Sequence, residues 1–286
     1  MQFVISVPDD FSLLATIQAH GWIQLPPFGW LPDSGVLSYA YETDSGGVAE
    51  VRISEADGVL VVDAEGADAQ EGVERRVRRM VQLDHSLCEF HAYCRADDKL
   101  AHIPEGRLGR MLRSSTLWED TVKVIATSNT TWTQTLAMTK RLTQEFGASS
   151  LHNDAVRAFP TPQRIAAVPF DEFASRARMG YRSAYVHVMA TDIANGVLDL
   201  EALQEASLTA TALRKRLLAL PGIGPYGAAC LMLYLGRPEH VNVDSWARML
   251  LSKELDRTVS DKEVAAFFAE YGAWSGLVYM FYPWAK

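Results

Sequence analysis

The sequence has few cysteines and no long apolar run. Its 286 residues include three cysteines, too few and too irregularly spaced for a disulfide framework, and it has no Cys-x-x-Cys pair. The seven histidines show no paired spacing with carboxylates, so no zinc site is predicted. No stretch of eighteen apolar residues occurs, and the first residues, MQFVISVPDDF, lack the basic region and apolar core of a secretory signal. We therefore expect no membrane span and a reducing, cytosolic compartment.

A surplus of basic residues is also missing. The formal net charge of -8 excludes a protein that coats nucleic acid indiscriminately, because phosphate neutralisation needs a basic surface. The balance reverses locally: residues 209–257 carry seven lysines and arginines against four acids. Much of the acid lies in residues 9–74, and such a dipolar distribution can still direct a polyanion to one face.

The pattern of apolar residues divides the chain into a β-rich beginning and a helical remainder, so the fold class is α+β. Four short runs rich in β-branched and aromatic residues are separated by turn signals, with one helix expected over Phe11–Ala19. These runs begin at Phe3, Val36, Val48 and Val59. We predict a small antiparallel β domain at 1–68 and a helical body at 69–286, with 117–206 as a central lobe if the body divides in two.

Helical spacing of apolar residues recurs through the body. The predicted helices are Gln70–Leu83, Ser86–Arg95, Leu117–Thr127, Thr131–Phe146, Asp171–Arg176, Ala184–Asn195, Leu198–Ala206, Thr209–Ala219, Tyr226–Leu235, Trp246–Glu254 and Asp261–Tyr271.

The most informative segment is Leu220–Ala229, which reads LPGIGPYGAA and lies between two of these helices. We expect Gly222 and Gly224 to give the backbone positive φ and close access to a partner, and Pro225 suits a first helical turn. The amides of such a bend and of the next helix start suit a phosphate. Twenty residues beyond Gly224, Asp244 begins another helix, where it could cap that helix or face the same ligand.

The hairpin followed by an apolar residue, Val243 and Asp244 resembles the helix-hairpin-helix DNA glycosylases. Further similarity lies in Ile125–Trp132, Phe159–Pro162, Gly180–Val186 and Tyr271–Gly276. This similarity, together with a β domain at the N-terminus, points to the 8-oxoguanine and type II 3-methyladenine branches. The resemblance implies removal of a damaged base that is swung out of duplex DNA.

The resemblance also implies roles for residues. Asp244 would be the catalytic carboxylate, stabilising positive charge on the sugar, although an N-cap alone is the alternative. The DNA contacts would come from Asn129, Pro221, Gly222, Ile223, Gly224 and Trp246. Asn129 would fill the gap left by the base, with a helix N-cap as the equal alternative. Trp246 occupies the position at which 8-oxoguanine glycosylases have a phosphate-contacting histidine. Its indole N–H can still donate to a phosphate.

Lyase members of the family use a hairpin lysine to form an imine with the sugar, and here that position is Tyr226. We therefore expect hydrolysis by water without backbone cleavage. An aromatic pocket attracts cationic alkylated purines. The residues expected in it are Tyr226, Cys230, Trp274, Tyr279 and Tyr282.

Two positions bear on the choice of lesion. Cys230 matches a base-contacting cysteine of 8-oxoguanine glycosylases, whereas Gly276 replaces their base-reading glutamine. The sequence thus favours a monofunctional glycosylase for an alkylated purine such as 3-methyladenine. An 8-oxoguanine glycosylase and a non-catalytic lesion-binding protein are the alternatives.

The expected partner is double-stranded DNA containing a damaged base, and we expect a monomer. Cys230 is the last cysteine, so no C-terminal iron–sulfur cluster is expected. No cofactor is expected other than a monovalent cation at the hairpin when DNA is bound. Cytoplasmic localisation at the nucleoid, or nuclear localisation in a eukaryote, would follow.

Overall fold

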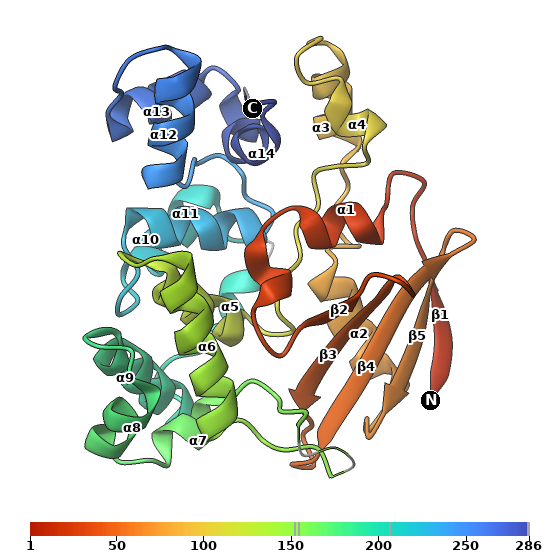
Figure 1. Ribbon diagram of the computed structural model, residues 1–286, viewed down its shortest axis with the longest axis vertical. Helices are drawn as coiled ribbons and strands as arrows, with labels where there is room; N and C mark the ends of the chain where they lie inside the picture. Colours follow the sequence, from red (N-terminus) through yellow and green to blue (C-terminus); the bar gives the residue numbers. More distant parts are fainter. Residues whose placement is uncertain (152, 154, 206, 285–286) are drawn as a thin grey trace. The chain divides into compact units, whose positions relative to one another are not determined.

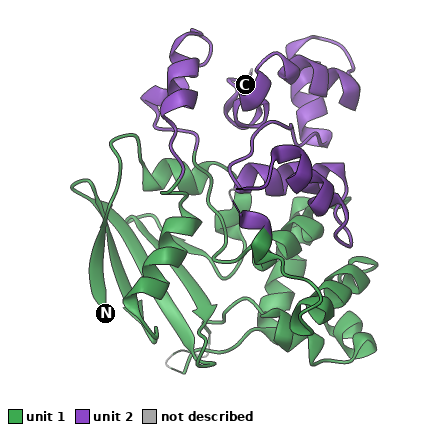
Figure 2. Cartoon of the chain, turned by 180° about the vertical axis from the view of Figure 1, so that it is seen from behind, with its two compact units in different colours: residues 1–84, 110–202 green, residues 85–109, 203–286 purple. Residues whose placement is uncertain are grey.

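The computed structural model describes residues 1–151, 153, 155–205 and 207–284. The chain forms two compact units, each assembled from segments that are distant in sequence (Figure 2). Unit 1 comprises residues 1–84 and 110–202, and unit 2 comprises residues 85–109 and 203–286. The predicted boundary at residue 68 coincides with the end of the sheet, and as a domain limit it stays a prediction.

Unit 1 begins with an antiparallel sheet of five strands in the order β1-β5-β4-β3-β2 (Figure 1). Leu37, Ile53 and Val62 are paired across three neighbouring strands and are fully buried, so they form one face of the sheet. Asp57 and Gly58 both have positive φ between β4 and β5, as a two-residue hairpin requires. The strands are β1 Gln2–Ser6, β2 Gly29–Leu31, β3 Val36–Glu42, β4 Val48–Ala56 and β5 Val59–Glu65.

The helix α5, Leu117–Thr127, lies in the interior of unit 1, with residues 117–126 all buried, and α6 and α9 pack against it. Thr116 caps α5 by accepting a hydrogen bond from the Glu119 amide at 3.2 Å. The other helical elements are α1 Leu13–Gln18, η1 Gly21–Gln24, α2 Gln70–Met80, α6 Trp132–Phe146, α7 Pro162–Ala166, α8 Phe170–Ala177, α9 Arg182–Ala194 and η2 Glu201–Gln204.

Buried ion pairs lie inside unit 1. On α5, Lys123 lies 2.6 Å from Glu119, and both side chains are almost fully buried. Asp120 lies 3.0 Å from Arg79 of α2, and it also accepts a hydrogen bond from the Trp22 indole at 3.2 Å. The Tyr39 hydroxyl of β3 donates to Glu119, so the sheet and α5 share one polar network.

Unit 2 consists of helices only, among its described residues. They are α3 Cys88–Arg95, α4 His102–Glu105, α10 Ala210–Leu218, α11 Pro225–Tyr234, α12 Ser245–Glu254, α13 Asp261–Ala269, η3 Gly272–Trp274 and α14 Ser275–Phe281. His102 contacts the Phe281 carbonyl oxygen at 2.9 Å, which joins the early segment of this unit to its last helix.

The α+β class and the N-terminal antiparallel sheet are confirmed, but two predicted helices are wrong. The helix expected over 198–206 is a single turn, η2, because the Asp199 side chain accepts from the Ala202 amide and Glu201 bonds to the start of α5. Residue 206 lies outside the described residues. The first helix covers Leu13–Gln18 only. The short elements η1, β2, α4, α7, η3 and α14 were not predicted. No helix in the described part of the chain could span a membrane.

Candidate functional site

The hairpin between α10 and α11 has an open backbone. Gly222 has φ +77°, so a side chain would be strained there. Gly224 is instead extended, with φ -94° and ψ -172°, which corrects the expectation that both glycines need positive φ. A Cβ added at Gly224 would meet no protein atom within 4 Å. Within the described chain, the amides of Gly222 and Gly224 donate to no acceptor, and the adjoining start of α11 adds further donors.

Asp244 is the N-cap of α12, where its Oδ1 accepts a hydrogen bond from the Ala247 amide at 2.8 Å. The Tyr279 hydroxyl approaches the same oxygen at 3.5 Å. Oδ2 accepts no hydrogen bond from any residue that the structure describes. Trp246, in the first turn of α12, is 59% exposed. Asp244 therefore caps a helix with one oxygen and has the other oxygen available, so the two alternative roles are compatible.

Cys230 lies inside α11 in a polar setting. Hydrogen bonds from Tyr226 and Asn242 reach its thiol. Burial raises the pKa of Cys230 to about 12 in spite of these donors, so the thiol stays neutral. Asn242 precedes Asp244 by two residues and has a buried Oδ1 without a hydrogen-bond partner in the described structure. The structure thus brings Tyr226 and Cys230 together, and it adds Asn242, which was not selected from the sequence.

The other expected pocket residues belong to an aromatic cluster. The Tyr279 and Tyr282 rings pack edge-on against Phe268, at centroid distances of 5.4 and 5.5 Å. Trp274 packs against Phe90 at 5.3 Å. Tyr279 and Tyr282 are buried and Trp274 is half-buried. Packing therefore accounts for the rings of Tyr282 and Trp274, whereas the Tyr279 hydroxyl faces Asp244.

Gly276 on α14 permits a close backbone contact. Its amide donates to the Pro238 carbonyl oxygen at 2.7 Å. A Cβ at Gly276 would lie 2.7 Å from the His240 carbonyl oxygen and 2.9 Å from that of Pro238. The protein backbone thus occupies the direction in which a side chain at this position would project.

Asn129 belongs to unit 1, in the turn between α5 and α6, and it is exposed. Its φ of +48° is left-handed, a conformation that asparagine tolerates. Thr131 caps α6, so the alternative reading of Asn129 as the helix N-cap is wrong. The Asn129 side-chain amide lies 3.5 Å from the Tyr181 hydroxyl.

Two neighbours of Asn129 were not selected from the sequence. Arg182 is buried and donates to the carbonyl oxygens of Ser128 and Asn129, the latter at 3.0 Å. Its guanidinium also lies over the Tyr181 ring, 4.6 Å from the centroid, and Tyr181 is 55% exposed. The segment Gly180–Val186 carried part of the family resemblance. That resemblance was the signal in the sequence that could have pointed to Tyr181 and Arg182. Arg182 fixes the turn that presents Asn129.

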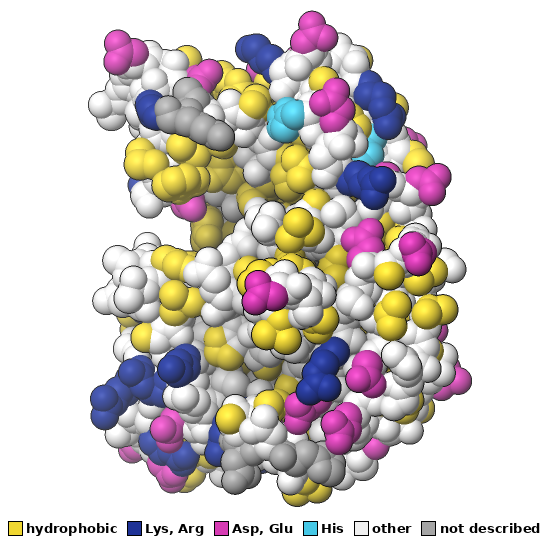
Figure 3. Space-filling view, turned by 45° about the vertical axis from the view of Figure 1, so that its right-hand side comes forward, with side chains coloured by type: hydrophobic (Ala, Val, Ile, Leu, Met, Phe, Trp, Pro, Cys, Tyr) yellow, Lys and Arg dark blue, Asp and Glu magenta, His cyan; other side chains and the backbone are white. Residues whose placement is uncertain are grey.

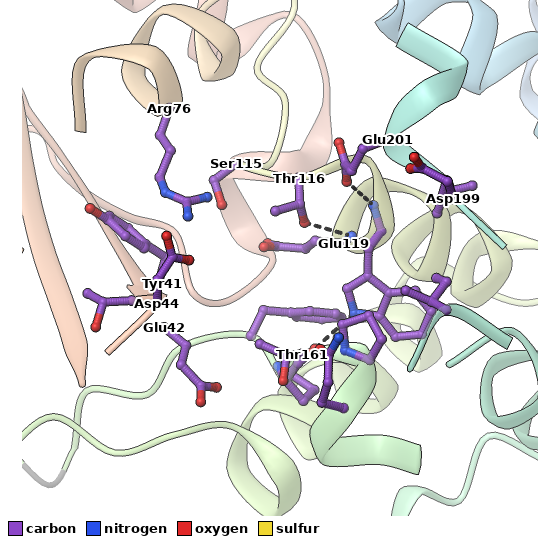
Figure 4. Close-up of a pocket in the computed structure, with 18 of the residues that line it drawn as sticks. Tyr41, Glu42, Asp44, Arg76, Ser115, Thr116, Glu119, Thr161, Asp199 and Glu201 are labelled. Carbon is purple, nitrogen blue, oxygen red and sulfur yellow. Dashed lines mark hydrogen bonds between the residues drawn. The ribbon is translucent and has the colours of Figure 1, made fainter. Parts of the chain in front are cut away.

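A separate cavity of about 840 Å³ lies within unit 1 (Figure 4). Arg76 lies over the Tyr41 ring at 4.4 Å, and Glu201 accepts hydrogen bonds from the first amides of α5. Burial raises the pKa of both Glu119 and Glu201. The carboxylates lining the cavity are Glu42, Asp44, Glu119, Asp199 and Glu201. An acidic lining of this kind repels phosphate, so the cavity lacks the chemistry of a DNA contact.

Basic side chains on the face shown in Figure 3 gather in several places, with acidic side chains between them. This agrees with the net charge of -8, which leaves no continuous basic coat. Among the residues that the structure describes, no group of three or more His, Cys, Asp or Glu side chains could hold a metal ion.

Comparison with known families identifies the architecture around the hairpin and Asp244. The model of the HhH-GPD superfamily of base excision DNA repair proteins matches residues 122–273, more than half of the chain. The chain belongs to the HhH-GPD superfamily. This confirms the family recognised from the sequence, and with it a DNA-binding protein of the DNA glycosylase class.

Relatives of both expected branches share the fold. The 3-methyladenine DNA glycosylase from Archaeoglobus fulgidus matches with a TM-score of 0.77 and 18% identity, covering 98% of this chain and 97% of that one. The apo form of Clostridium acetobutylicum 8-oxoguanine glycosylase/lyase matches with a TM-score of 0.75 and 21% identity, covering 99% and 96%. A Methanothermobacter thermautotrophicus protein named "Probable N-glycosylase/DNA lyase" is 23% identical, over 95% of this chain and 92% of its own.

Proposed function

We propose that this HhH-GPD protein is a monofunctional DNA glycosylase, which hydrolyses the N-glycosidic bond of an alkylated purine such as 3-methyladenine. The observation that carries the proposal is the environment of Asp244. One carboxylate oxygen is fixed by the Ala247 amide, and the other has no hydrogen-bond partner among the described residues. A cap needs only one oxygen, so the second is available to a sugar.

The chemistry needs a fixed negative charge beside C1′. As the bond from C1′ to the base nitrogen breaks, its electron pair leaves with the base and the sugar becomes oxocarbenium-like. The Asp244 carboxylate stabilises that positive charge, and water attacks C1′ and gives up a proton. An alkylated purine is cationic before cleavage and leaves as a neutral base, so it needs no separate proton donor. The products are the free base and an abasic site.

DNA binding in this proposal uses backbone amides as well as side chains. The amides of Gly222 and Gly224, with the start of α11, bind a phosphate. The open space around Gly224 supports this role because it leaves room for a phosphate. Trp246 donates to the DNA backbone, and Asn129 fills the gap left by the extruded base.

The residue at the lysine position supports hydrolysis without lyase activity. Tyr226 has a phenol, which forms no imine with the sugar, and α11 contains no lysine. Two relatives carry "lyase" in their names, so the absence of this step would separate the present chain from them.

The proposed substrate rests on the base pocket. The backbone close to Gly276 leaves no room for a base-reading glutamine, which disfavours 8-oxoguanine. Tyr226 supplies an aromatic ring of the kind that attracts a cationic base. Cys230 favours a second candidate function, excision of 8-oxoguanine, because a cysteine at this position contacts the base in the family members that it resembles.

One assay tests the reaction, the lesion and the nucleophile together. The protein is incubated with DNA carrying radiolabelled N-methylpurines and, separately, with duplexes containing 8-oxoguanine opposite cytosine. Released bases are separated by chromatography, and the strands are analysed with and without alkali. We expect methylpurine release, strand breaks only after alkali, and no adduct trapped by borohydride. Faster release of 8-oxoguanine would support the second candidate.

Two results would contradict the proposal. A borohydride-trapped adduct with breaks before alkali would show an amine nucleophile and exclude the water mechanism. Tight binding to lesion DNA without release of any base would identify a non-catalytic lesion-binding protein.

A further inference from the structure

The Tyr279 hydroxyl has a single hydrogen-bond partner in the described structure. Tyr279 lies on α14 and is 5% exposed, with its ring against Phe268 and Trp284. A buried phenol usually finds a hydrogen-bond partner, because an unpaired hydroxyl is costly. The partner within reach here is Asp244 Oδ1, at 3.5 Å. The distance is long, as hydrogen bonds in ligand-free active sites often are before the substrate tightens them.

Two donors from different helices meet at this one oxygen. The Ala247 amide comes from α12 and the Tyr279 hydroxyl from α14. A carboxylate held by one donor can still rotate about its Cβ–Cγ bond, whereas two donors on the same oxygen oppose that rotation. Oδ2 therefore has no hydrogen-bond donor among the described residues and stays available to a ligand. Preorganisation of this kind is what stabilises a charge that develops only in the transition state.

We propose that Tyr279 is a positioning residue for base excision, which donates a hydrogen bond to Asp244 Oδ1 and so keeps Oδ2 directed at the sugar. This inference rests on the proposed function, because it assumes that Asp244 is the catalytic carboxylate.

The protonation states of the neighbouring groups suit this role. Burial, followed by the negative charge of Asp244, raises the pKa of Tyr279 well above its ordinary value. The other titratable group that acts on Tyr279 is Cys230 of α11, whose thiol is neutral because burial raises its pKa to about 12. Tyr279 is therefore a phenol, and a donor, throughout the neutral range.

Y279F removes the donor and keeps the ring. Without it, one donor instead of two holds Oδ1, so the carboxylate rotates more freely. We expect the single-turnover rate of base release to fall about tenfold at pH 7, as the loss of one hydrogen bond to a charged group implies. Affinity for undamaged DNA should not change.

Y282F is the matched control. Tyr282 is 7% exposed, packs edge-on against the same Phe268, and has Tyr271 as its hydroxyl partner. It loses one buried hydroxyl in the same aromatic cluster, but that hydroxyl does not contact Asp244. A structural effect would appear in both variants, whereas only the loss in Y279F should depend on Asp244. Y279F in the D244N background should be no slower than D244N alone.

The experiment measures single-turnover base release at pH 7 for the wild type, Y279F, Y282F, D244N and the Y279F/D244N double variant, on the lesion that the wild type releases fastest. A wild-type rate for Y279F, equal losses in Y279F and Y282F, or a further loss when Y279F is added to D244N would overturn the role of Tyr279, while a strongly impaired D244N upheld the proposed function. An active D244N, or no release by the wild type, would overturn both.

A second variant covers the case in which Y279F does not fold. Replacement of Tyr279 by 3-fluorotyrosine preserves the ring and makes its hydroxyl a stronger donor. We expect this protein to release the base at least as fast as the wild type, in contrast to Y279F. A loss as large as that expected for Y279F would contradict the proposal.

Discussion

Asp120 in unit 1 and Asp244 in unit 2 are both carboxylates near the start of a helix, and their surroundings differ. Asp120 is fully buried, and Ser114, Trp22 and Arg79 occupy both of its oxygens. Asp244 uses one oxygen for the Ala247 amide and Tyr279, and the second accepts nothing from the described residues. A fully satisfied carboxylate contributes to stability, whereas a half-satisfied one has an oxygen left for a ligand. The same substitution at the two positions should therefore have opposite consequences.

D120N should have the largest effect, and that effect is on stability. The change removes a charge that faces Arg79 at 3.0 Å in a buried site. Breaking such a pair costs about 3 to 5 kcal/mol, because the remaining charge is left poorly compensated. Urea unfolding would measure the loss, with D98N as the control at an exposed aspartate, where a change below about 0.5 kcal/mol is expected. Equal stability of D120N and D98N would contradict the stabilising role of Asp120.

D244N should affect activity instead. Asparagine caps a helix as well as aspartate, so stability should change by less than about 0.5 kcal/mol. Base release should slow by about 100-fold to 1,000-fold, because the carboxylate no longer stabilises the charge on the sugar. Single-turnover release at pH 7 and urea unfolding on the same preparation would measure both. Full activity in this variant would mean that Asp244 serves only as a cap.

G224A tests whether the open hairpin backbone of unit 2 binds DNA. Alanine accepts the extended conformation, and its Cβ meets no protein atom, so we expect a stability loss of only about 0.5 to 1 kcal/mol from the poorer N-cap. Duplex affinity should fall about fivefold to tenfold, because a methyl group displaces a phosphate from the amides.

The control for this variant is G72A, in α2, where an added Cβ also meets nothing within 4 Å. G72A should raise helix stability and leave duplex affinity unchanged. Fluorescence anisotropy with a labelled duplex would compare the two variants. Equal affinities would remove the hairpin amides from the proposed interface.

His20 is half-buried, and it loses its charge on folding instead of pairing it. Burial lowers its pKa to about 4, and its ring nitrogens contact the Trp22 amide and the Leu112 carbonyl oxygen. Between pH 6.5 and about 4 the unfolded chain binds a proton that the folded protein does not, so stability falls as the pH falls through this window. H20Q should lose less stability than the wild type between pH 7 and pH 4.5 in urea unfolding. Parallel losses in the two proteins would show that His20 is not responsible.

The sequence predicted the elements whose signals are local. The bounds of α5 were predicted correctly because apolar residues at helical spacing follow the capping residue Thr116. The Asp57-Gly58 turn was equally clear, since both residues tolerate positive φ. The hairpin and its position before Asp244 were recognised for the same reason: the residues that make the turn are adjacent in the chain.

The errors came from contacts between distant segments. Nothing near Glu119 or Lys123 in the sequence indicates burial, because the partners that stabilise these charges include Tyr39 on the sheet. The helix predicted over 198–206 fails because Glu201 is bonded to α5, more than eighty residues away. The contact between Tyr279 of α14 and Asp244 joins residues 35 positions apart. The sequence of α14 carries no cap or turn signal that would predict this helix.

The sequence by itself determined the family, the hairpin and the presence of an aspartate at a helix start, because turn chemistry and capping depend on adjacent residues. Only the tertiary structure decided which oxygen of Asp244 is occupied, that Tyr279 is the residue beside it, and that no side chain fits at Gly276. These features depend on the packing of α14 against other segments of unit 2, and hydrogen-bond geometry between distant segments leaves no periodic trace in a sequence.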